Sequence, residues 1–204
     1  GKIQTSLGSF STATGLLNVN VASTNLGFAG SYQQNYSSQD FLYTYNDKNF
    51  TRENAWYQHR NIFSKLSFGS SHHEFSINYN FAEESRGLPS AFYNEMKHYD
   101  ARAGSRYHTV LFNHRWFASS RFYLQNLVGY HSLNQLFINE NQPKLAYHTR
   151  NKNSSPEVNI SGNLKVGPTI QSRLGIHYLG ERLEGENLLN PQLDIGKKSR
   201  DNLA

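Results

Sequence analysis

Apolar and polar positions alternate along residues 72–89, HHEFSINYNFAEESRGLP. One set of alternate positions carries most of the large apolar side chains: His73, Phe75, Ile77, Tyr79, Phe81 and Glu83. Because successive side chains of a β-strand point to opposite faces, the pattern predicts a strand with one apolar and one polar face. It is longer than the five or six residues usual in soluble proteins. It ends at Arg86-Gly87-Leu88-Pro89, a turn-prone sequence.

The same alternation recurs along the chain and predicts nine strands, with a tenth that begins near Arg200. The other eight cover residues 2–7, 16–22, 26–36, 56–68, 106–117, 121–137, 157–166 and 169–179. In 157–166 the alternation is clean, whereas in 56–68 it is imperfect. There Arg60 falls among the apolar positions and Phe63 among the polar ones.

The connections between these strands alternate in length. Short turns are predicted near Thr24, Ser70, Ser119 and Gly167. Long loops are predicted at about 38–54, 87–103, 139–155 and 181–200. In an antiparallel meander this places the long loops at one end, as in transmembrane barrels with short periplasmic turns and longer extracellular loops. The sequence therefore predicts an all-β fold, an antiparallel up-and-down transmembrane β-barrel, here an incomplete segment of about nine to ten strands.

Composition agrees with strands that are apolar on one face only. Hydrophobic residues make up 37% of the chain, aromatic residues make up 14%, and the mean hydropathy is −0.68. That is poor in aliphatic residues for a globular core. The apolar face is therefore expected to meet lipid and the polar face a water-filled or plugged lumen. No stretch is long and apolar enough for a transmembrane helix.

Charge, cysteine and histidine content narrow the candidate chemistry. The net charge of +5 comes from scattered Lys and Arg, so no nucleic-acid surface is predicted. The chain has no cysteine, which excludes disulfides and thiolate metal sites. Adjacent His72 and His73 would point to opposite faces, and His59, His131 and His177 are expected to line the lumen. We therefore predict no metal site, no cofactor and no catalytic residue.

Three stretches resemble one family, the TonB-dependent outer-membrane receptors, and in particular its vitamin B12 and siderophore receptor group. They are Ile3-Gln4-Thr5-Ser6-Leu7-Gly8-Ser9-Phe10-Ser11-Thr12, Arg52-Glu53-Asn54 leading into Gln58-His59-Arg60-Asn61-Ile62-Phe63-Ser64-Lys65-Leu66-Ser67, and Arg86-Gly87-Leu88-Pro89. The first is similar to the family's first barrel strand, the second to its fourth, and the third to its Arg-Gly-Ile/Leu-Pro-Gly motif. Ser11 and Ser90 stand where the family usually has Gly.

The resemblance implies that residues 1–204 are the N-terminal half of the β-barrel, without the plug domain and the remaining strands. Such barrels have about 22 strands around a plugged lumen. The implied function is energised import of a scarce metal chelate or vitamin (siderophore or cobalamin) across the outer membrane of a Gram-negative cell. The implied partners are that ligand, TonB through the absent N-terminal part, and outer-membrane lipid and lipopolysaccharide. The chain would not be an enzyme.

Aromatic residues in the predicted loops are candidate ligand-binding groups. They are Tyr43, Tyr45, Phe92, Tyr93 and Tyr147. Exposed aromatic side chains bury a large area at modest entropic cost, so they suit ligand capture. Packing of one loop on another is the alternative role. Loop cations could attract an anionic siderophore or lipopolysaccharide phosphates; they are Lys97, Arg102, Lys144, Arg150 and Lys152.

Two other functions use the same strand pattern. A passive porin-type channel needs alternating strands but no plug. A small outer-membrane barrel hydrolase would carry Ser, His and Asp at its rim, and such triads are recognised by geometry rather than by spacing. No Gly-x-Ser-x-Gly nucleophile elbow occurs in the chain.

Overall fold

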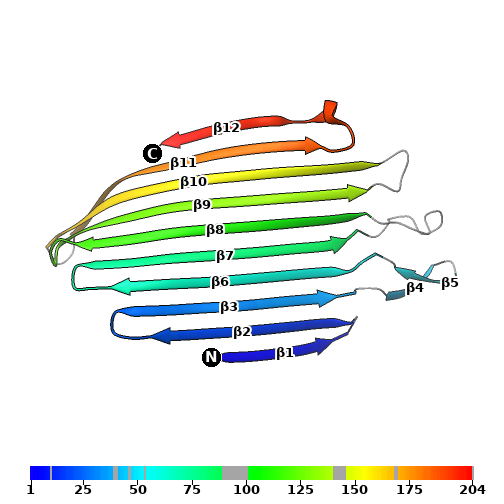
Figure 1. Ribbon diagram of the computed structural model, residues 1–204, viewed down its shortest axis with the longest axis horizontal. Helices are drawn as coiled ribbons and strands as arrows, with labels where there is room; N and C mark the ends of the chain where they lie inside the picture. Colours follow the sequence, from blue (N-terminus) through cyan, green and yellow to red (C-terminus); the bar gives the residue numbers. More distant parts are fainter. Residues whose placement is uncertain are drawn as a thin grey trace.

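The computed structural model describes residues 1–9, 11–38, 41–45, 47–52, 54–88, 101–139, 146–167 and 170–203. Ten of its strands form one antiparallel sheet in the order β1-β2-β3-β6-β7-β8-β9-β10-β11-β12 (Figure 1). Neighbours in the sheet are neighbours in the chain, except that the separate β4–β5 hairpin lies between β3 and β6. The predicted up-and-down antiparallel architecture is confirmed.

The sheet strands are long. Their bounds are β1 Lys2–Gly8, β2 Thr12–Ala22, β3 Leu26–Ser37, β6 Tyr57–Gly69, β7 His73–Gly87, β8 Arg102–Phe117, β9 Phe122–Asn139, β10 Tyr147–Val166, β11 Ile170–Asn187 and β12 Gly196–Leu203. The hairpin strands are β4 Phe41–Tyr45 and β5 Lys48–Arg52, and a 3-10 turn, η1, covers Pro191–Leu193. Among the described residues no helix has the length and apolar character needed to cross a bilayer.

Each predicted strand corresponds to a strand of the sheet, but two predicted loops are wrong in extent. The loop predicted at 139–155 is mostly strand, because β10 begins at Tyr147. The loop predicted at 181–200 is also shorter, because β11 runs to Asn187 and β12 begins at Gly196. Charged residues at these strand ends form cross-strand pairs, such as Lys197–Glu184 at 3.2 Å. The polar residues at these positions therefore belong to paired strands, not to loops as predicted. The predicted loop 38–54 contains the β4–β5 hairpin.

The two ends of the sheet differ. At the short-turn end, serines close three turns: Ser23, Ser70 and Ser119 each donate a backbone N–H to the carbonyl of the residue three positions later. Their hydroxyls accept the backbone N–H of the same residues. At the long-loop end lie the β4–β5 hairpin and the connections at 88–101, 140–146 and 188–195, together with the short β1–β2 connection (Figure 1).

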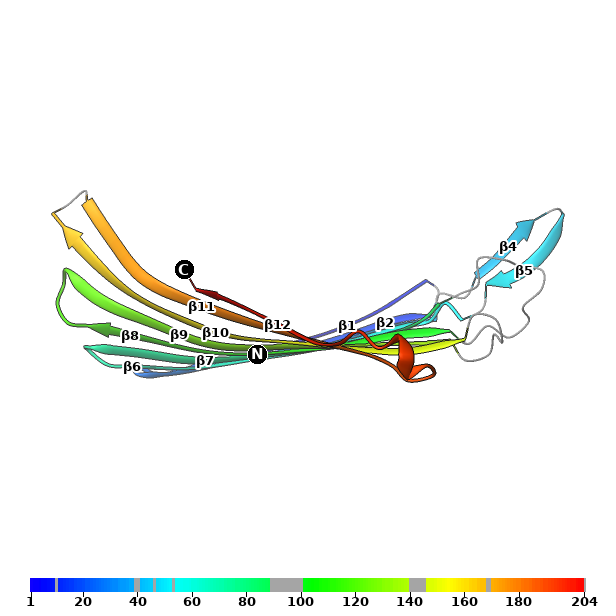
Figure 2. The same ribbon diagram turned by 90° about the horizontal axis from the view of Figure 1, so that it is seen from above.

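The sheet is open and curved. β1 and β12 form its opposite edges and pair on one side only. Seen from above, the sheet is bent along its strands, and the β4–β5 hairpin projects past the long-loop end (Figure 2). Large side chains are not fully buried in the described part of the chain, where the buried apolar residues are Ala55, Ala101 and Ile138. The sheet therefore has no hydrophobic core of its own.

Candidate functional site

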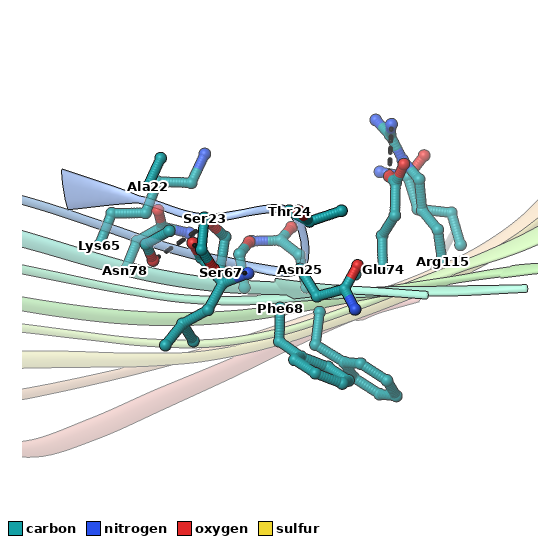
Figure 3. A pocket seen from close by; sticks show the side chains of 17 residues that line it. Ala22, Ser23, Thr24, Asn25, Lys65, Ser67, Phe68, Glu74, Asn78 and Arg115 are labelled. Carbon is teal, nitrogen blue, oxygen red and sulfur yellow. Dashed lines mark hydrogen bonds and ion pairs between the residues drawn. The ribbon is translucent and has the colours of Figure 1, made fainter. Parts of the chain in front are cut away.

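The strand register builds one face of the sheet from apolar rows. The row through Ile77 crosses nine strands and holds Val21, Phe28, Leu66, Ile77, Phe112, Val128, Val158, Tyr178 and Leu203. We call this the outward face, and the opposite face, which carries Asn78, the inward face. In Figure 3, Lys65, Ser67, Asn78, Glu74 and Arg115 rise on one side of the sheet, and the Phe68 ring lies on the other.

Apolar side chains of the outward face are exposed to solvent in the isolated chain. Ile77 is 47% exposed, Ile176 64% and Leu174 83%. Contiguous apolar patches of this extent are rare on soluble monomers and mark a surface that meets another apolar phase or partner. The face therefore requires an apolar neighbour that the chain itself does not provide.

The apolar band of the outward face runs obliquely across the strands. On β3 it begins at Leu26. The residues that pair with Leu26 from strand to strand across the sheet reach β11 at Ile176. On β11 the band begins six residues nearer the short-turn end, at Ile170. Six strand-to-strand steps separate β3 from β11, so the band shifts by an average of about one residue per strand. With a rise of about 3.3 Å and a strand spacing of about 4.8 Å, this corresponds to a strand tilt of about 35°.

That tilt has a direct structural meaning. A band that is level in a membrane must cross tilted strands obliquely, and barrel strands tilt by about 35–45°. A flat soluble sheet has no reason to displace its apolar positions by six residues between β3 and β11. The band therefore matches the lipid-facing surface of a tilted barrel wall.

On the inward face, polar side chains from four neighbouring strands meet near the middle of the sheet. The Glu157 carboxylate lies 3.1 Å from His177 Nε2 and 3.4 Å from His131 Nε2. His131 Nδ1 lies 3.2 Å from the hydroxyls of Tyr107 and Thr109. Among the described residues, no three metal-binding side chains are arranged to hold an ion. The cluster is a partly exposed polar surface that can exchange hydrogen bonds with a solute or a polypeptide.

Two hollows extend this polar surface toward both ends. Near the long-loop end a hollow of about 410 Å³ is lined by Glu84, Arg86, Gln135 and Asn151 among others. Near the short-turn end a hollow of about 540 Å³ includes Lys65, Glu74 and Arg115 (Figure 3). Glu74 and Arg115 form an ion pair at 3.6 Å. Charged groups of both signs therefore line the inward face along its length.

The histidines predicted to line the lumen lie on the inward face. His59 shares a row with Asn35 and Glu84, and His131 and His177 both contact Glu157. The imperfect alternation of 56–68 is also confirmed. Arg60 lies on the outward face beside Glu83, with their charged atoms 3.8 Å apart, and Phe63 lies inward beside Asn80.

A compact junction at the long-loop end ties together three chain segments. Asn54 adopts a left-handed backbone conformation, with φ of 57°, which Asn tolerates better than most residues. Its Nδ2 donates to the carbonyls of Leu88, at 3.2 Å, and Ala101, at 2.7 Å. Ala101 is fully buried. Asn54 therefore holds both ends of the 88–101 connection against the start of β6.

Gly87 completes this junction because it lacks a side chain. A Cβ at Gly87 would lie 2.4 Å from the Asn54 carbonyl oxygen and 2.8 Å from Trp56 Nε1. Two of the stretches quoted for the family resemblance, Arg52-Glu53-Asn54 and Arg86-Gly87-Leu88-Pro89, therefore meet in space. The sequence pointed to both stretches but not to their contact, and the bridging role of Asn54 became visible only in the fold.

The predicted ligand-binding aromatics are only partly placed. The backbones of Tyr43 and Tyr45 belong to β4, opposite Phe50 and Lys48. Tyr147 begins β10 opposite Asn139. All three positions lie at the long-loop end (Figure 1). Phe92 and Tyr93 lie outside the described residues. Convergence of these aromatic side chains on a ligand stays a prediction.

Comparisons with known proteins add no identity. No protein-family model matches the chain, and no curated protein matches it. The functional argument therefore depends on the two faces of the sheet, the tilt of the apolar band and the junction at Asn54.

Proposed function

We propose that the chain is a wall segment of an outer-membrane β-barrel transporter that imports a metal chelate or vitamin with energy delivered through TonB. The observation that carries the membrane part of the proposal is the row through Ile77, which crosses nine strands and in which the Tyr178 hydroxyl is the one polar side-chain group. Every strand of a membrane barrel faces lipid on its outer side, so each strand needs an apolar residue there. The open edges at β1 and β12 fit a wall that continues into further strands.

The transport part of the proposal depends on the inward face. A polar wall with Glu84 and Arg86 near the long-loop end and Glu74 and Arg115 near the other suits the passage of a hydrated or charged solute. The TonB-dependent assignment depends on the motif resemblance, and the contact between Asn54 and the segment after Gly87 supports it. A motif whose glycine is required by packing is less easily explained as chance.

The test is uptake by cells that express the complete protein carrying residues 1–204. Labelled ferric siderophore and cobalamin would be offered to cells with and without a functional TonB. The proposal expects saturable uptake of one ligand class that is lost without TonB. Uptake that persists without TonB and rises linearly with concentration would instead establish a passive channel. Absence of the protein from the outer membrane would reject both functions.

Candidate aromatics can be tested in the same cells. Tyr93→Ala or Tyr147→Ala in the complete protein should weaken ligand capture, seen as a raised half-saturation concentration for uptake. Barrel yield should not change, because Tyr147 is the first residue of β10 and Tyr93 falls between β7 and β8 in the sequence, outside both strands. Leu42→Ala, in the same hairpin as Tyr43 and 77% exposed, is a control that removes loop apolar surface elsewhere. Wild-type uptake in both tyrosine variants would contradict the predicted role.

A further inference from the structure

Three polar side chains on the outward face form a hydrogen-bonded chain within the apolar band. They are His73 on β7, His114 on β8 and Asn126 on β9, three strands that are neighbours in the sheet (Figure 1). His73 Nδ1 lies 3.1 Å from His114 Nε2, and Asn126 Nδ2 lies 3.2 Å from His114 Nδ1. The Phe75 ring stacks on the His114 ring, with centroids 4.4 Å apart. These contacts hold the Asn126 carboxamide in a fixed orientation.

Asn126 lies deep inside the band. The other outward positions of β9 around it are apolar or aromatic: Phe122, Leu124, Val128 and Tyr130. Asn126 is four residues from Phe122 and four from Tyr130. At about 3.3 Å per residue and a tilt of about 35°, it lies about 11 Å inside both ends of this run. His73, the first residue of β7, lies at the short-turn end. The polar chain therefore leads from the border of the band to its middle.

The Asn126 carboxamide has unused hydrogen-bonding capacity at this depth. Its Nδ2 carries two N–H donors, and its Oδ1 is an acceptor. One N–H is directed at His114, and among the described residues the Asn126 side chain makes no other hydrogen bond. A polar group that faces hydrocarbon without a partner is costly, and lipid chains supply no hydrogen-bonding groups. A partner for Asn126 therefore has to bring its own polar group to the same depth.

We propose that Asn126 is the centre of a contact between two copies of this protein, side by side in the membrane and related by a two-fold axis along the membrane normal. Copies inserted in the same orientation hold Asn126 at the same depth, and a two-fold axis can place this residue opposite itself. Asparagine is self-complementary, because Nδ2 of each copy can donate to Oδ1 of the other. With the second N–H of each Nδ2 kept on His114, both donors and the carbonyl oxygen of each carboxamide are used.

The surroundings of Asn126 suit such a contact. Apolar side chains form a rim around it: Ile160 is its partner on β10 and is 50% exposed, and Val128 follows it on β9 and is 48% exposed. Gly162, opposite Leu124 on β10, adds no side chain to the rim. Small residues allow two surfaces to approach closely in a membrane, and asparagines hydrogen-bond across such contacts. A polar centre inside an apolar rim is also typical of the residues that dominate binding energy in interfaces.

The contact depends on the proposed membrane wall and not on transport, so the two proposals can fail separately. A cross-linking experiment tests the geometry in the complete protein, inserted in lipid vesicles. Residues 1–204 contain no cysteine, so Asn126→Cys introduces a single thiol once any cysteine elsewhere in the complete protein is replaced by serine. A disulfide needs Cβ atoms about 3.8 Å apart. We expect Asn126→Cys to form disulfide-linked dimers on mild oxidation.

The matched control for cross-linking is Phe28→Cys. Phe28 lies on the same face and is 43% exposed, but it is four strand-to-strand steps from β9, or about 19 Å. It should stay monomeric under the same oxidation. Equal cross-linking of both variants would show random collision and would overturn the proposal. A disulfide from Asn126→Cys to a different membrane protein in cells would also overturn it, because the contact would then belong to another partner.

A second experiment measures the strength of the contact. Donor- and acceptor-labelled copies of the complete protein are diluted with lipid, and the loss of energy transfer gives the dimer dissociation constant. Asn126→Leu should raise this constant roughly tenfold, because two hydrogen bonds of the strength usual in membranes are lost. Its barrel yield should be normal, because leucine suits a lipid-facing position. Gln125→Leu, at the adjacent inward position, should leave the constant unchanged.

Two results would overturn the contact whatever happens to uptake. One is a wild type that shows no energy transfer between copies at any lipid dilution. The other is an Asn126→Leu variant that associates as tightly as the wild type. Dimers that behave as expected in a protein whose uptake does not need TonB would support the contact and count only against the transport proposal.

Discussion

The two faces of the sheet differ in how uniform the polarity of their residues is from strand to strand. Across nine strands the outward row through Ile77 is apolar apart from the Tyr178 hydroxyl, whereas the inward row beside it mixes polar, charged and apolar residues. That row holds three asparagines, two leucines, a lysine, a glutamate, an alanine and a glycine: Asn20, Ala29, Lys65, Asn78, Leu111, Gly129, Glu157, Leu179 and Asn202. Every residue of the outward row would contact the same apolar phase, so the row is uniform in polarity. At inward positions the residue type depends on the side chains beside it, as the histidines around Glu157 show.

The largest test of this difference is a charge placed on each face of β7. Ile77→Arg should lower the free energy of unfolding of the complete barrel in lipid vesicles by about 2–4 kcal/mol, because the charge would enter hydrocarbon. Asn78→Arg should change it by less than about 0.5 kcal/mol, as for ordinary exposed sites. Urea unfolding of vesicle-inserted protein, followed by tryptophan fluorescence, measures both. Equal losses at the two positions would remove the distinction between the faces.

A smaller effect is expected from a pair of glycines on β10 and β11. A Cβ at Gly175, on the inward face, would lie 2.8 Å from the Ile160 carbonyl oxygen, and that backbone atom cannot easily move aside. At outward Gly162 the nearest atom is 3.5 Å away, an ordinary contact. Gly175→Ala should therefore cost about 1–3 kcal/mol, and Gly162→Ala should be neutral or stabilising by up to about 1 kcal/mol. The reverse order of stabilities would show that the inward face is not the crowded one here.

The smallest effect concerns two carboxylates on opposite faces. Glu83 and Glu157 are similarly exposed, at 24% and 25% of their side chains, and each contacts two basic partners. The partners of Glu83 are guanidinium groups, which are always charged, whereas those of Glu157 are imidazoles, which are charged only when protonated. Glu83→Gln should therefore cost up to about 1 kcal/mol, and Glu157→Gln should cost less.

High salt should change the costs of Glu83→Gln and Glu157→Gln by different amounts. The cost of Glu83→Gln should shrink in 1 M salt, where the Debye length falls to about 3 Å. The cost of Glu157→Gln should change less with salt, because its partners include no permanently charged group. Unfolding midpoints of the two variants and the wild type at low and high salt provide the comparison. A larger and more salt-sensitive loss at Glu157 than at Glu83 would contradict the expected order.

Strand existence followed from local pattern, but strand length did not. The alternation around Ile77 and Val158 predicted strands correctly because burial against one apolar phase imposes a period of two. The same argument failed beyond Glu181 and before Ser155, where polar side chains continue the strand by pairing across it, as Lys152 does with Glu184 and Glu186. Pairs of this kind depend on register, which a single strand does not encode.

The candidate site was also predictable only in part: the face on which a residue lies followed from the sequence, but its contacts did not. The inward positions of His59, His131 and His177 were predictable from parity. The contact of His131 and His177 with Glu157 was not, because these residues are joined only when β9, β10 and β11 align. The bridge from Asn54 to Leu88 and Ala101 joins positions 34 and 47 residues apart, and the motifs in the sequence indicated only the separate stretches.

By itself, the sequence determined that this protein consists of two-faced antiparallel strands with long connections at one end, because side-chain alternation and turn chemistry are local properties. The tertiary structure determined which residues of different strands lie side by side on each face. Register aligned single apolar residues into rows across the sheet, displaced the start of the apolar band by six residues between β3 and β11, and brought Arg60 and Arg106 beside Glu83. These features arise between strands, where hydrogen-bond pairing rather than local preference sets which residues meet.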